Sequence, residues 1–267
     1  MKRIAIFGVP RSGTSWLSQI LNSCPDVAMR FQPLFSYGHK GKLSENSTLE
    51  DIYSFFDEIL LSNDPFALQK TKHHKNYPVF NKSALPTHIA FKEVRYLNII
   101  ENLLISKVDI KIIGIVRNPL SVLASWTKAP KEFDPSWNLM SEWRYATLKN
   151  DNRPEEFYGF EKWKDSTINF INYKKKYPNK FLLVKYSDLI EDTIKTTKKV
   201  FKFCQLKLDE QVIQFIDASK SRFDFDDLYS VYRAKTSDVE WQNVLPVEIK
   251  NTIFSELNQT ALEIFLN

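Results

Sequence analysis

Apolar and polar positions alternate along the chain in a way that predicts strands interleaved with helices. Short apolar runs at 4–7, 88–92, 109–116 and 181–186 are typical of buried parallel strands, and 27–30 fits a further short strand. Between these runs, apolar residues recur at helical spacing. This order predicts an α/β fold of three layers, with a mostly parallel central sheet flanked by helices.

The helical segments carry signals for where they begin and end. Thr48 precedes an apolar pattern that runs to Leu61, and Asp51 follows three residues later, which predicts a capping box. Further helices are expected from Thr14, over 94–106, from Pro119 through Trp126, over 161–176, from an Asp188 cap through Cys204, and over 247–265. The polar stretch 63–86 is expected to be a long exposed segment, and such segments often form lids. No repeat or linker divides the pattern, so residues 1–267 are expected to form one domain.

Composition narrows the classes of function. With 43% hydrophobic residues, 267 residues can bury a sizeable core. The net charge of +5 suits an anionic ligand but is too small and dispersed for a nucleic-acid partner. Cys24 and Cys204 lie in no CxxC pattern, so buried, reduced thiols are expected. Because no apolar run is long enough for a membrane span or a signal-peptide core, the protein is expected to be cytoplasmic, with no membrane partner.

The loop between the first strand and the first helix has the geometry of a phosphate-binding loop. Gly8, Gly13 and Ser15 fit the pattern G-x-x-x-x-G-K-[ST], but Thr14 stands where the lysine belongs. The cation comes earlier, at Arg11, so the loop is suited to a phosphate that has no γ-phosphoryl group to transfer. The alternative is a tight strand-to-helix turn that binds nothing.

Two further strand ends carry unusual residues. After the strand 109–116 the chain reads R-N-P-L-S-V-L-A-S, with Arg117 at the strand end and Ser125 two turns into the next helix. After Val184 it reads K-Y-S-D-L, which includes Tyr186. Ligands bind at the carboxyl ends of parallel strands, so these residues and the first loop are expected to meet.

Together with P-R-S-G-T-S-W-L in the first loop, these motifs resemble the family of sulfotransferases that use 3′-phosphoadenylyl sulfate (PAPS). The resemblance implies that Arg11, Ser12, Gly13, Thr14 and Ser15 wrap the 5′-phosphosulfate of the donor, that Arg117 and Ser125 hold its 3′-phosphate, and that Trp16 and Tyr186 contact the adenine. Arg233 and Lys235 loosely match the family's C-terminal donor-binding segment, although its glycines are missing. Core packing is the alternative role for Trp16 and Tyr186, and a surface helix cap is the alternative for Arg117.

The resemblance also implies a mechanism. The sulfuryl group would be displaced in line, and Arg11 would stabilise the leaving adenosine 3′,5′-bisphosphate (PAP). No metal is expected. In agreement, the strand 110–116 does not end in the aspartate that holds magnesium in P-loop kinases.

The general base is left open by the sequence. Many relatives place a glutamate in the segment that matches 31–33, but this chain has Gln32, which cannot take a proton. His39, in a loop, and Glu93, at a strand end, are the candidates. Glu93 is at least as well explained by pairing with Lys92 or Arg95, and His39 by a solvent-exposed loop.

The sequence therefore predicts a sulfotransferase that acts on a hydroxyl group or, less favoured, an amine of its acceptor. Aromatic residues in 31–37 and 126–143 are expected to shape the acceptor pocket, which favours a carbohydrate. The alternatives are a P-loop kinase with a degenerate loop and an inactive protein that binds the 3′,5′-bisphosphate. Acceptor identity and oligomeric state are not determined by the sequence.

Overall fold

A parallel sheet forms the centre of the protein. The computed structural model describes residues 1–70, 77–222, 230–232 and 237–266 and, within them, a five-stranded sheet of order β2-β3-β1-β4-β5. Its strands are β1 (Lys2–Phe7), β2 (Val27–Phe31), β3 (His88–Glu93), β4 (Ile110–Val116) and β5 (Phe181–Lys185). Each neighbouring pair is parallel, so the predicted sheet is confirmed.

The register brings the ends of the central strands to one edge. Phe7 pairs with Glu93 of β3 and with Gly114 of β4, and Val116 pairs with Lys185 of β5. The loops that follow β1, β3, β4 and β5 therefore leave the sheet side by side. The loops after β1, β4 and β5 are those to which the sequence assigned donor binding, and the end of β3 carries Glu93, a candidate base.

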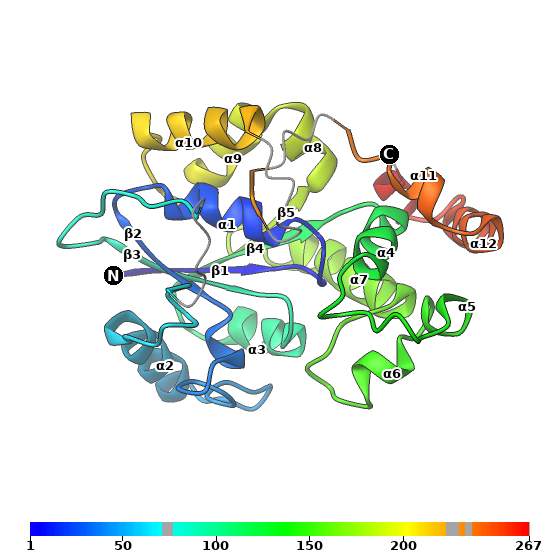
Figure 1. Cartoon of the computed structure of the whole chain (residues 1–267). Coiled ribbons are helices and arrows are strands. Elements are labelled where there is room, and N and C mark those ends of the chain that lie inside the picture. Colours follow the sequence, from blue (N-terminus) through cyan, green and yellow to red (C-terminus); the bar gives the residue numbers. More distant parts are fainter. Residues whose placement is uncertain (71–76, 223–229, 233–236, 267) are drawn as a thin grey trace.

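Helices cover both faces of the sheet (Figure 1). They are α1 (Thr14–Asn22), α2 (Leu49–Leu61), α3 (Ile100–Ile105), α4 (Pro119–Thr127), α5 (Leu139–Glu142), α6 (Thr147–Asn150), α7 (Phe160–Lys176), α8 (Tyr186–Glu191), α9 (Thr193–Cys204), α10 (Glu210–Ser221), α11 (Trp241–Val244) and α12 (Val247–Leu257). Short 3₁₀ turns lie at Pro33–Phe35, Leu97–Ile99 and Glu263–Phe265.

Alternate residues of β1 face two separate cores. Ile4 and Ile6 pack with apolar residues of α1, α9 and α10, whereas Ala5 and Phe7 pack with those of α2, α3 and α7. All four side chains are fully buried, and burying an isoleucine or phenylalanine contributes about 1.5–3 kcal/mol. The helix layers in Figure 1 lie over these two cores, which completes the predicted three-layer arrangement.

The start of α2 at Leu49 confirms its predicted cap, and α4 begins at Pro119 as predicted. The Asp51 N–H donates to Thr48 Oγ1 at 3.2 Å, and the Thr48 N–H donates to Asp51 Oδ2 at 2.7 Å, which completes a capping box. Asn118 caps α4 by accepting the N–H of Leu120 at 2.9 Å.

Three predicted helix boundaries are wrong. The helix expected over 94–106 has its α-helical part only from Ile100, because Tyr96 adopts a φ of +58° and a 3₁₀ turn follows it. Asp188 lies inside α8, and it is Asp192 that caps α9 by accepting the N–H of Lys195 at 2.8 Å. The last long helix ends at Leu257 rather than continuing to 265.

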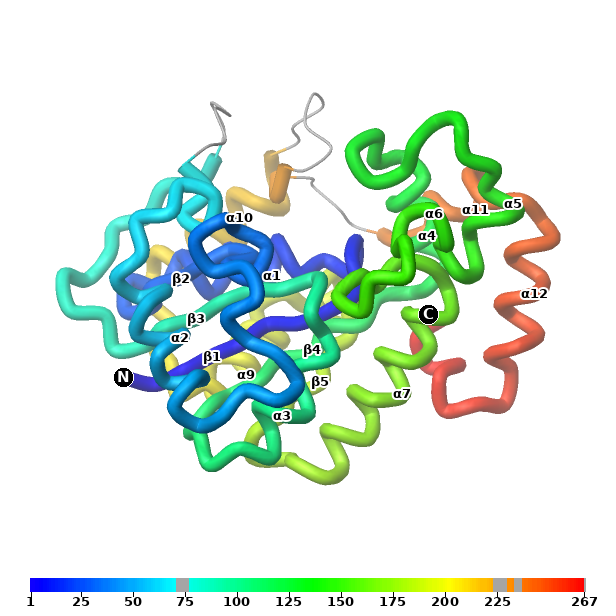
Figure 2. The backbone as a smooth tube through the Cα atoms, turned by 90° about the horizontal axis from the view of Figure 1, so that it is seen from below, coloured from blue at the N-terminus to red at the C-terminus, as the bar shows by residue number. Residues whose placement is uncertain are grey.

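The C-terminal helices are tied to the rest of the protein by charge. In Figure 2, α11 and α12 lie on the side of the molecule that carries α5. Arg144 pairs with Glu161 of α7 and with Glu256 of α12, and Lys164 joins both carboxylates. This network anchors α12 against α7.

Two further expectations concern the cysteines and the membrane. Cys24 and Cys204 are buried free thiols, as predicted. Among the described residues, no helix has both the length and the apolar character needed to cross a bilayer.

Candidate donor and acceptor site

The loop from Gly8 to Gly13 turns the chain tightly from β1 into α1. A side chain on Gly8 would approach the Ile115 carbonyl oxygen to 2.7 Å, and one on Gly13 would lie 2.4 Å from the Tyr186 ring. Gly13 also has a φ of +90°, which favours glycine. Because glycine has no side chain to cap a helix, the first N–H groups of α1 are available to an anion.

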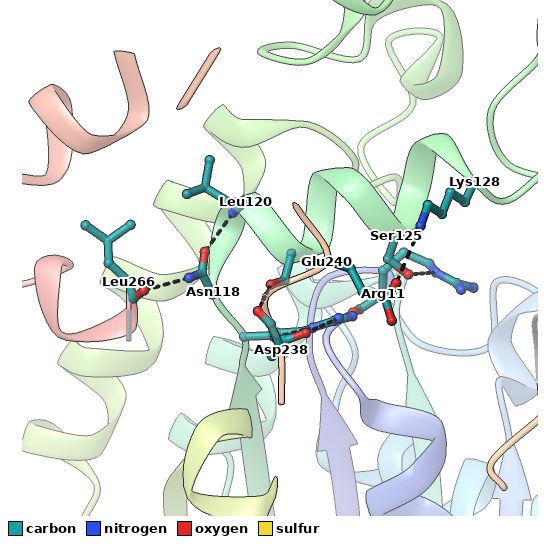
Figure 3. A network of polar contacts seen from close by, with 10 residues as sticks. Arg11, Asn118, Leu120, Ser125, Lys128, Asp238, Glu240 and Leu266 are labelled. Atoms are coloured by element: carbon teal, nitrogen blue, oxygen red, sulfur yellow. Dashed lines mark hydrogen bonds and ion pairs between the residues drawn. The ribbon is translucent and has the colours of Figure 1, made fainter. Parts of the chain in front are cut away.

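Arg11 points from this loop toward α4. Its backbone has a φ of +71°, which is unusual for a residue with a side chain. Its Nε donates to Ser125 Oγ at 3.0 Å, and its Nη1 lies 3.8 Å from Glu132 Oε1. Arg11 and Ser125, both predicted to bind the sulfuryl donor, are therefore in direct contact (Figure 3).

Arg117 follows β4 and is buried, with 7% of its surface exposed. Its guanidinium forms two hydrogen bonds with the Asp238 carboxylate, and its Nη1 donates to the Arg11 carbonyl oxygen at 2.9 Å. The guanidinium also lies 4.9 Å from the centre of the Tyr186 ring. Burial lowers the pKa of Arg117, but its hydrogen bonds to the Asp238 carboxylate and the negative charge nearby outweigh this effect and raise that pKa above its usual value.

Trp16 and Tyr186 form an aromatic corner beside the loop. Their rings meet edge to face, with centroids 6.3 Å apart. The Trp16 indole N–H donates to Ser219 Oγ at 2.9 Å. Both rings are fixed by these contacts, and a planar base fits against a corner of this kind.

These residues line one cavity of about 430 Å³. From the predicted donor residues it includes Arg11, Gly13, Thr14, Ser15, Trp16, Arg117, Ser125 and Tyr186. The remaining wall includes Gln32, Phe35, Phe66, Gln69, Lys92, Val94, Arg95, Lys131, Glu132 and Tyr158. The cavity thus joins the three predicted motifs and extends beyond them.

Among the described residues, three predicted site residues, Ser12, His39 and Glu93, do not line the cavity. Ser12 is fully buried, and its N–H donates to the Val9 carbonyl oxygen at 3.2 Å, so it closes the turn. His39 is buried rather than exposed, and its Nε2 lies 2.8 Å from Ser62 Oγ at the end of α2. Arg233 and Lys235 lie outside the described residues.

Glu93 is fully buried at the end of β3, behind the cavity wall. Its Oε1 accepts the Leu34 N–H at 2.9 Å, and within the described ranges its Oε2 has no hydrogen-bond partner. Burial raises the pKa of Glu93 to about 8, although the Leu34 N–H and the charges of Lys92 and Arg95 lower it. Arg95 ion-pairs with Glu156 at 2.9 Å. Glu93 therefore fixes the turn after β2.

Several lining residues were not predicted. Glu132 is a carboxylate in the cavity wall, and its buried Oε2 has no hydrogen-bond partner in the part of the chain that the structure describes. Lys131 lies beside it, and Lys92 reaches the wall from β3. Asp238, bound to Arg117, was also missed. Glu132 and Asp238 come from segments with no regular pattern, so spacing gave no signal for them.

Comparison with known protein families identifies the family to which this chain belongs. Residues 1–253 match the family model described as a sulfotransferase domain. The chain belongs to the sulfotransferase family. The prediction made from the three motifs is thereby confirmed, and membership supports PAPS-dependent sulfuryl transfer rather than the kinase alternative.

Relatives of this sulfotransferase are distant. Carbohydrate sulfotransferase 3 of Tetronarce californica is 24% identical over 188 residues. The match covers 67% of this chain but only 41% of that protein, so the chain spans about two fifths of its relative.

Solved structures share the fold. The mouse sulfotransferase SULT7A1 complexed with PAP has a TM-score of 0.57 and 16% identity, covering 99% of this chain and 87% of that one. The sulfotransferase domain from the curacin biosynthetic pathway has a TM-score of 0.55 and 15% identity, covering 96% and 97%. Retinol dehydratase in a complex with retinol and PAP has a TM-score of 0.53 and 13% identity, covering 98% and 83%.

The described residues contain no cluster of metal-ligating side chains. Within them, no three His, Cys, Asp or Glu side chains are grouped so that they could hold a metal ion.

Proposed function

We propose that this sulfotransferase transfers the sulfuryl group of PAPS to a hydroxyl group of an acceptor bound in the same cavity, with an amine as the less favoured acceptor group. One observation carries the proposal. The loop cation Arg11, the buried Arg117 and the open N-terminus of α1 converge on one cavity beside an aromatic corner. Two arginines and a helix N-terminus suit a ligand with two phosphate groups, and the corner suits its base.

Each part of the donor has a proposed partner. The 5′-phosphosulfate binds Arg11 and the first N–H groups of α1, the 3′-phosphate binds Arg117 and Ser125, and the adenine packs on the corner of Trp16 and Tyr186. Ser125 fits this role because it already accepts a hydrogen bond from Arg11, so it lies between the two phosphate subsites. Ser12 supports the loop from behind.

The transfer proceeds by in-line displacement. The acceptor oxygen forms a bond to sulfur while the bond from sulfur to the 5′-phosphate oxygen breaks, and PAP leaves. Charge grows on that phosphate oxygen, where Arg11 stabilises it. A single well-placed donor of this kind contributes roughly 10²–10³ in rate. The helix N-terminus and two arginines supply the positive charge, so the proposal requires no metal ion.

We assign the removal of the acceptor proton to Glu132. It lies in the cavity wall beside Arg11, and its Oε2 has no hydrogen-bond partner among the described residues. Its backbone is held in place because its carbonyl oxygen accepts the Trp126 indole N–H at 3.0 Å. Glu93 and His39 are less suited, since neither lies in the wall.

A carbohydrate is the favoured acceptor. Phe35, Phe66 and Tyr158 line the same cavity, and aromatic faces pack well against sugar rings. The distant relative named carbohydrate sulfotransferase 3 is consistent with this choice.

Calorimetric titration with PAP, and in parallel with ATP and magnesium, tests the donor site. We expect PAP to bind at micromolar concentration and Arg117→Ala to abolish that binding, because it removes a buried cation. Binding of ATP with magnesium, without detectable binding of PAP, would contradict the proposal. Incubation with PAPS and a panel of sugars, phenols and amines then separates an enzyme from an inactive PAP-binding protein, since only the enzyme releases PAP with a sulfated product.

A further inference from the structure

The guanidinium of Arg117 already holds an anion that belongs to the protein. Its Nε donates to Asp238 Oδ2 at 2.8 Å and its Nη2 donates to Oδ1 at 2.5 Å, while Nη1 donates to the Arg11 carbonyl oxygen. Each of its three nitrogens therefore has a partner inside the protein. The two parallel bonds to Asp238 use the same fork that would bind a phosphate.

The segment that carries Asp238 is held against α4. The Ser121 hydroxyl donates to the Asp238 carbonyl oxygen at 3.0 Å, and Glu240 lies 3.5 Å from the ammonium group of Lys128. Figure 3 shows Asp238 and Glu240 on the segment that passes beside this helix, with Glu240 joined to Lys128. The carboxylate is thus positioned from two sides: by the arginine it binds and by the backbone bond from Ser121.

A 3′-phosphate and the Asp238 carboxylate cannot share this fork. Both are anions that bind the Nε and Nη2 edge of a guanidinium, and only 8% of the Arg117 side chain is exposed. A phosphate placed beside a retained carboxylate would meet a like charge at short range in a poorly screened site. Binding therefore requires that Asp238 release Arg117.

We propose that Asp238 is an internal anion that competes with the donor's 3′-phosphate for Arg117, and so sets how tightly this enzyme binds 3′-phosphorylated nucleotides. The inference rests on the proposed function, which places the 3′-phosphate at Arg117. Donor binding exchanges one anion for another: the phosphate takes the fork, and Asp238 moves away together with its bond to Ser121. Removing the charge of Asp238 removes the competing anion, so the Arg117 guanidinium binds phosphate more tightly.

Asp238→Asn tests the competition because it keeps the size of the side chain and removes its charge. We expect its affinity for PAP, measured by calorimetry, to rise about tenfold or more. Its affinity for adenosine 5′-monophosphate should remain within about twofold of the wild-type value, because that ligand has no phosphate to place on Arg117. Glu240→Gln is the matched control: it makes the same charge change two residues away, at a side chain that is 65% exposed.

A second variant covers the case in which Asp238→Asn fails to fold. Ser121→Ala removes the hydrogen bond that holds the segment without altering any charge. It should raise PAP affinity by a smaller factor, about two- to fivefold, and again leave adenosine 5′-monophosphate unaffected. Thermal unfolding of each variant identifies those that are folded.

The outcomes separate this inference from the proposed function. A gain for PAP alone in Asp238→Asn, absent in Glu240→Gln, supports the competition. Unchanged or weaker PAP binding in Asp238→Asn would overturn it and make Asp238 a positioning partner that Arg117 needs. An equal gain in affinity for both nucleotides, or an equal gain in PAP affinity in Glu240→Gln, would also overturn it. The effect would then come from the lower negative charge of the protein in general and not from the Arg117 fork. If PAP fails to bind both the wild type and Asp238→Asn, the donor site itself is wrong.

Discussion

Replacing Glu93 by glutamine is expected to remove a dependence of stability on pH that originates in one buried carboxyl. Glu93 lies at the end of β3, fully buried, and accepts the Leu34 N–H through Oε1. Glutamine keeps that acceptor and nearly the same volume but cannot ionise. The substitution therefore isolates the cost of charging this position.

The sign and size follow from the pKa. Burial raises the pKa of Glu93 from 4.5 to about 8, against the opposing charges of Lys92 and Arg95. Between these two values the folded protein binds more protons than the unfolded chain. The folded state is therefore favoured most below pH 4.5, where Glu93 is protonated in both states. This contribution to the free energy of unfolding is lost as the pH rises through about 8, where the buried carboxyl must ionise. At roughly 1.4 kcal/mol per pKa unit, the loss is at most on the order of 4–5 kcal/mol.

Urea unfolding from about pH 5 to about pH 9 measures the effect. The free energy of unfolding of the wild type should fall relative to that of Glu93→Gln across this range. The matched control is Glu101→Gln, at an exposed position on α3, which should run parallel to the wild type. If Glu93→Gln kept the wild-type slope, the carboxyl would not be protonated in the folded protein. A drop in turnover of 10² or more at unchanged stability would instead make Glu93 the base.

Two further substitutions test the cavity. Glu132→Gln should lower kcat by roughly 10²–10⁴-fold with an acceptor identified from the panel, because glutamine cannot take the proton. Its PAP affinity, measured by calorimetry, should stay within about tenfold of the wild-type value. An unchanged kcat would rule Glu132 out as the base. Gly13→Ala should destabilise the fold by about 1–3 kcal/mol and weaken PAP binding at least tenfold, because its Cβ would lie 2.4 Å from the Tyr186 ring at a φ of +90°. Thr48→Ala, which removes a helix cap worth about 1 kcal/mol at α2, is the control and should leave PAP binding unchanged.

The features that sequence predicted well are those set by short stretches of chain. The apolar runs located all five strands, because a buried parallel strand needs several apolar residues in succession. Parallel pairing then required their ends to meet at one edge, so Arg11, Arg117 and Tyr186 could be expected to share a site before any contact was known. Gly13 was likewise predictable, since a turn of this kind into a helix needs a residue that tolerates positive φ.

What sequence missed depends on contacts between distant segments. Glu132 and Asp238 enter the site from irregular stretches, whose course is set by packing on α4 rather than by any periodic pattern. Burial was misjudged for His39 for the same reason: the loop that carries it folds back against the end of α2. The helix boundary after β3 was shifted by Tyr96, whose left-handed backbone has no signature in its residue type.

The pairing of both donor-site arginines with carboxylates has an energetic reason. Arg117 donates to the backbone carbonyl oxygen of Arg11, so the buried Arg117 guanidinium lies against the loop that carries the second arginine. An unpaired buried charge would cost several kcal/mol, and Asp238 offsets that cost for Arg117. The same contact weakens donor binding, because it must be given up. The Asp238→Asn variant should therefore have a lower free energy of unfolding than the wild type without ligand, and PAP should restore it. The carboxylate thus raises the stability of the unliganded protein and lowers its affinity for PAP. A variant that lost stability without regaining it on PAP addition would show that the carboxylate serves the fold alone.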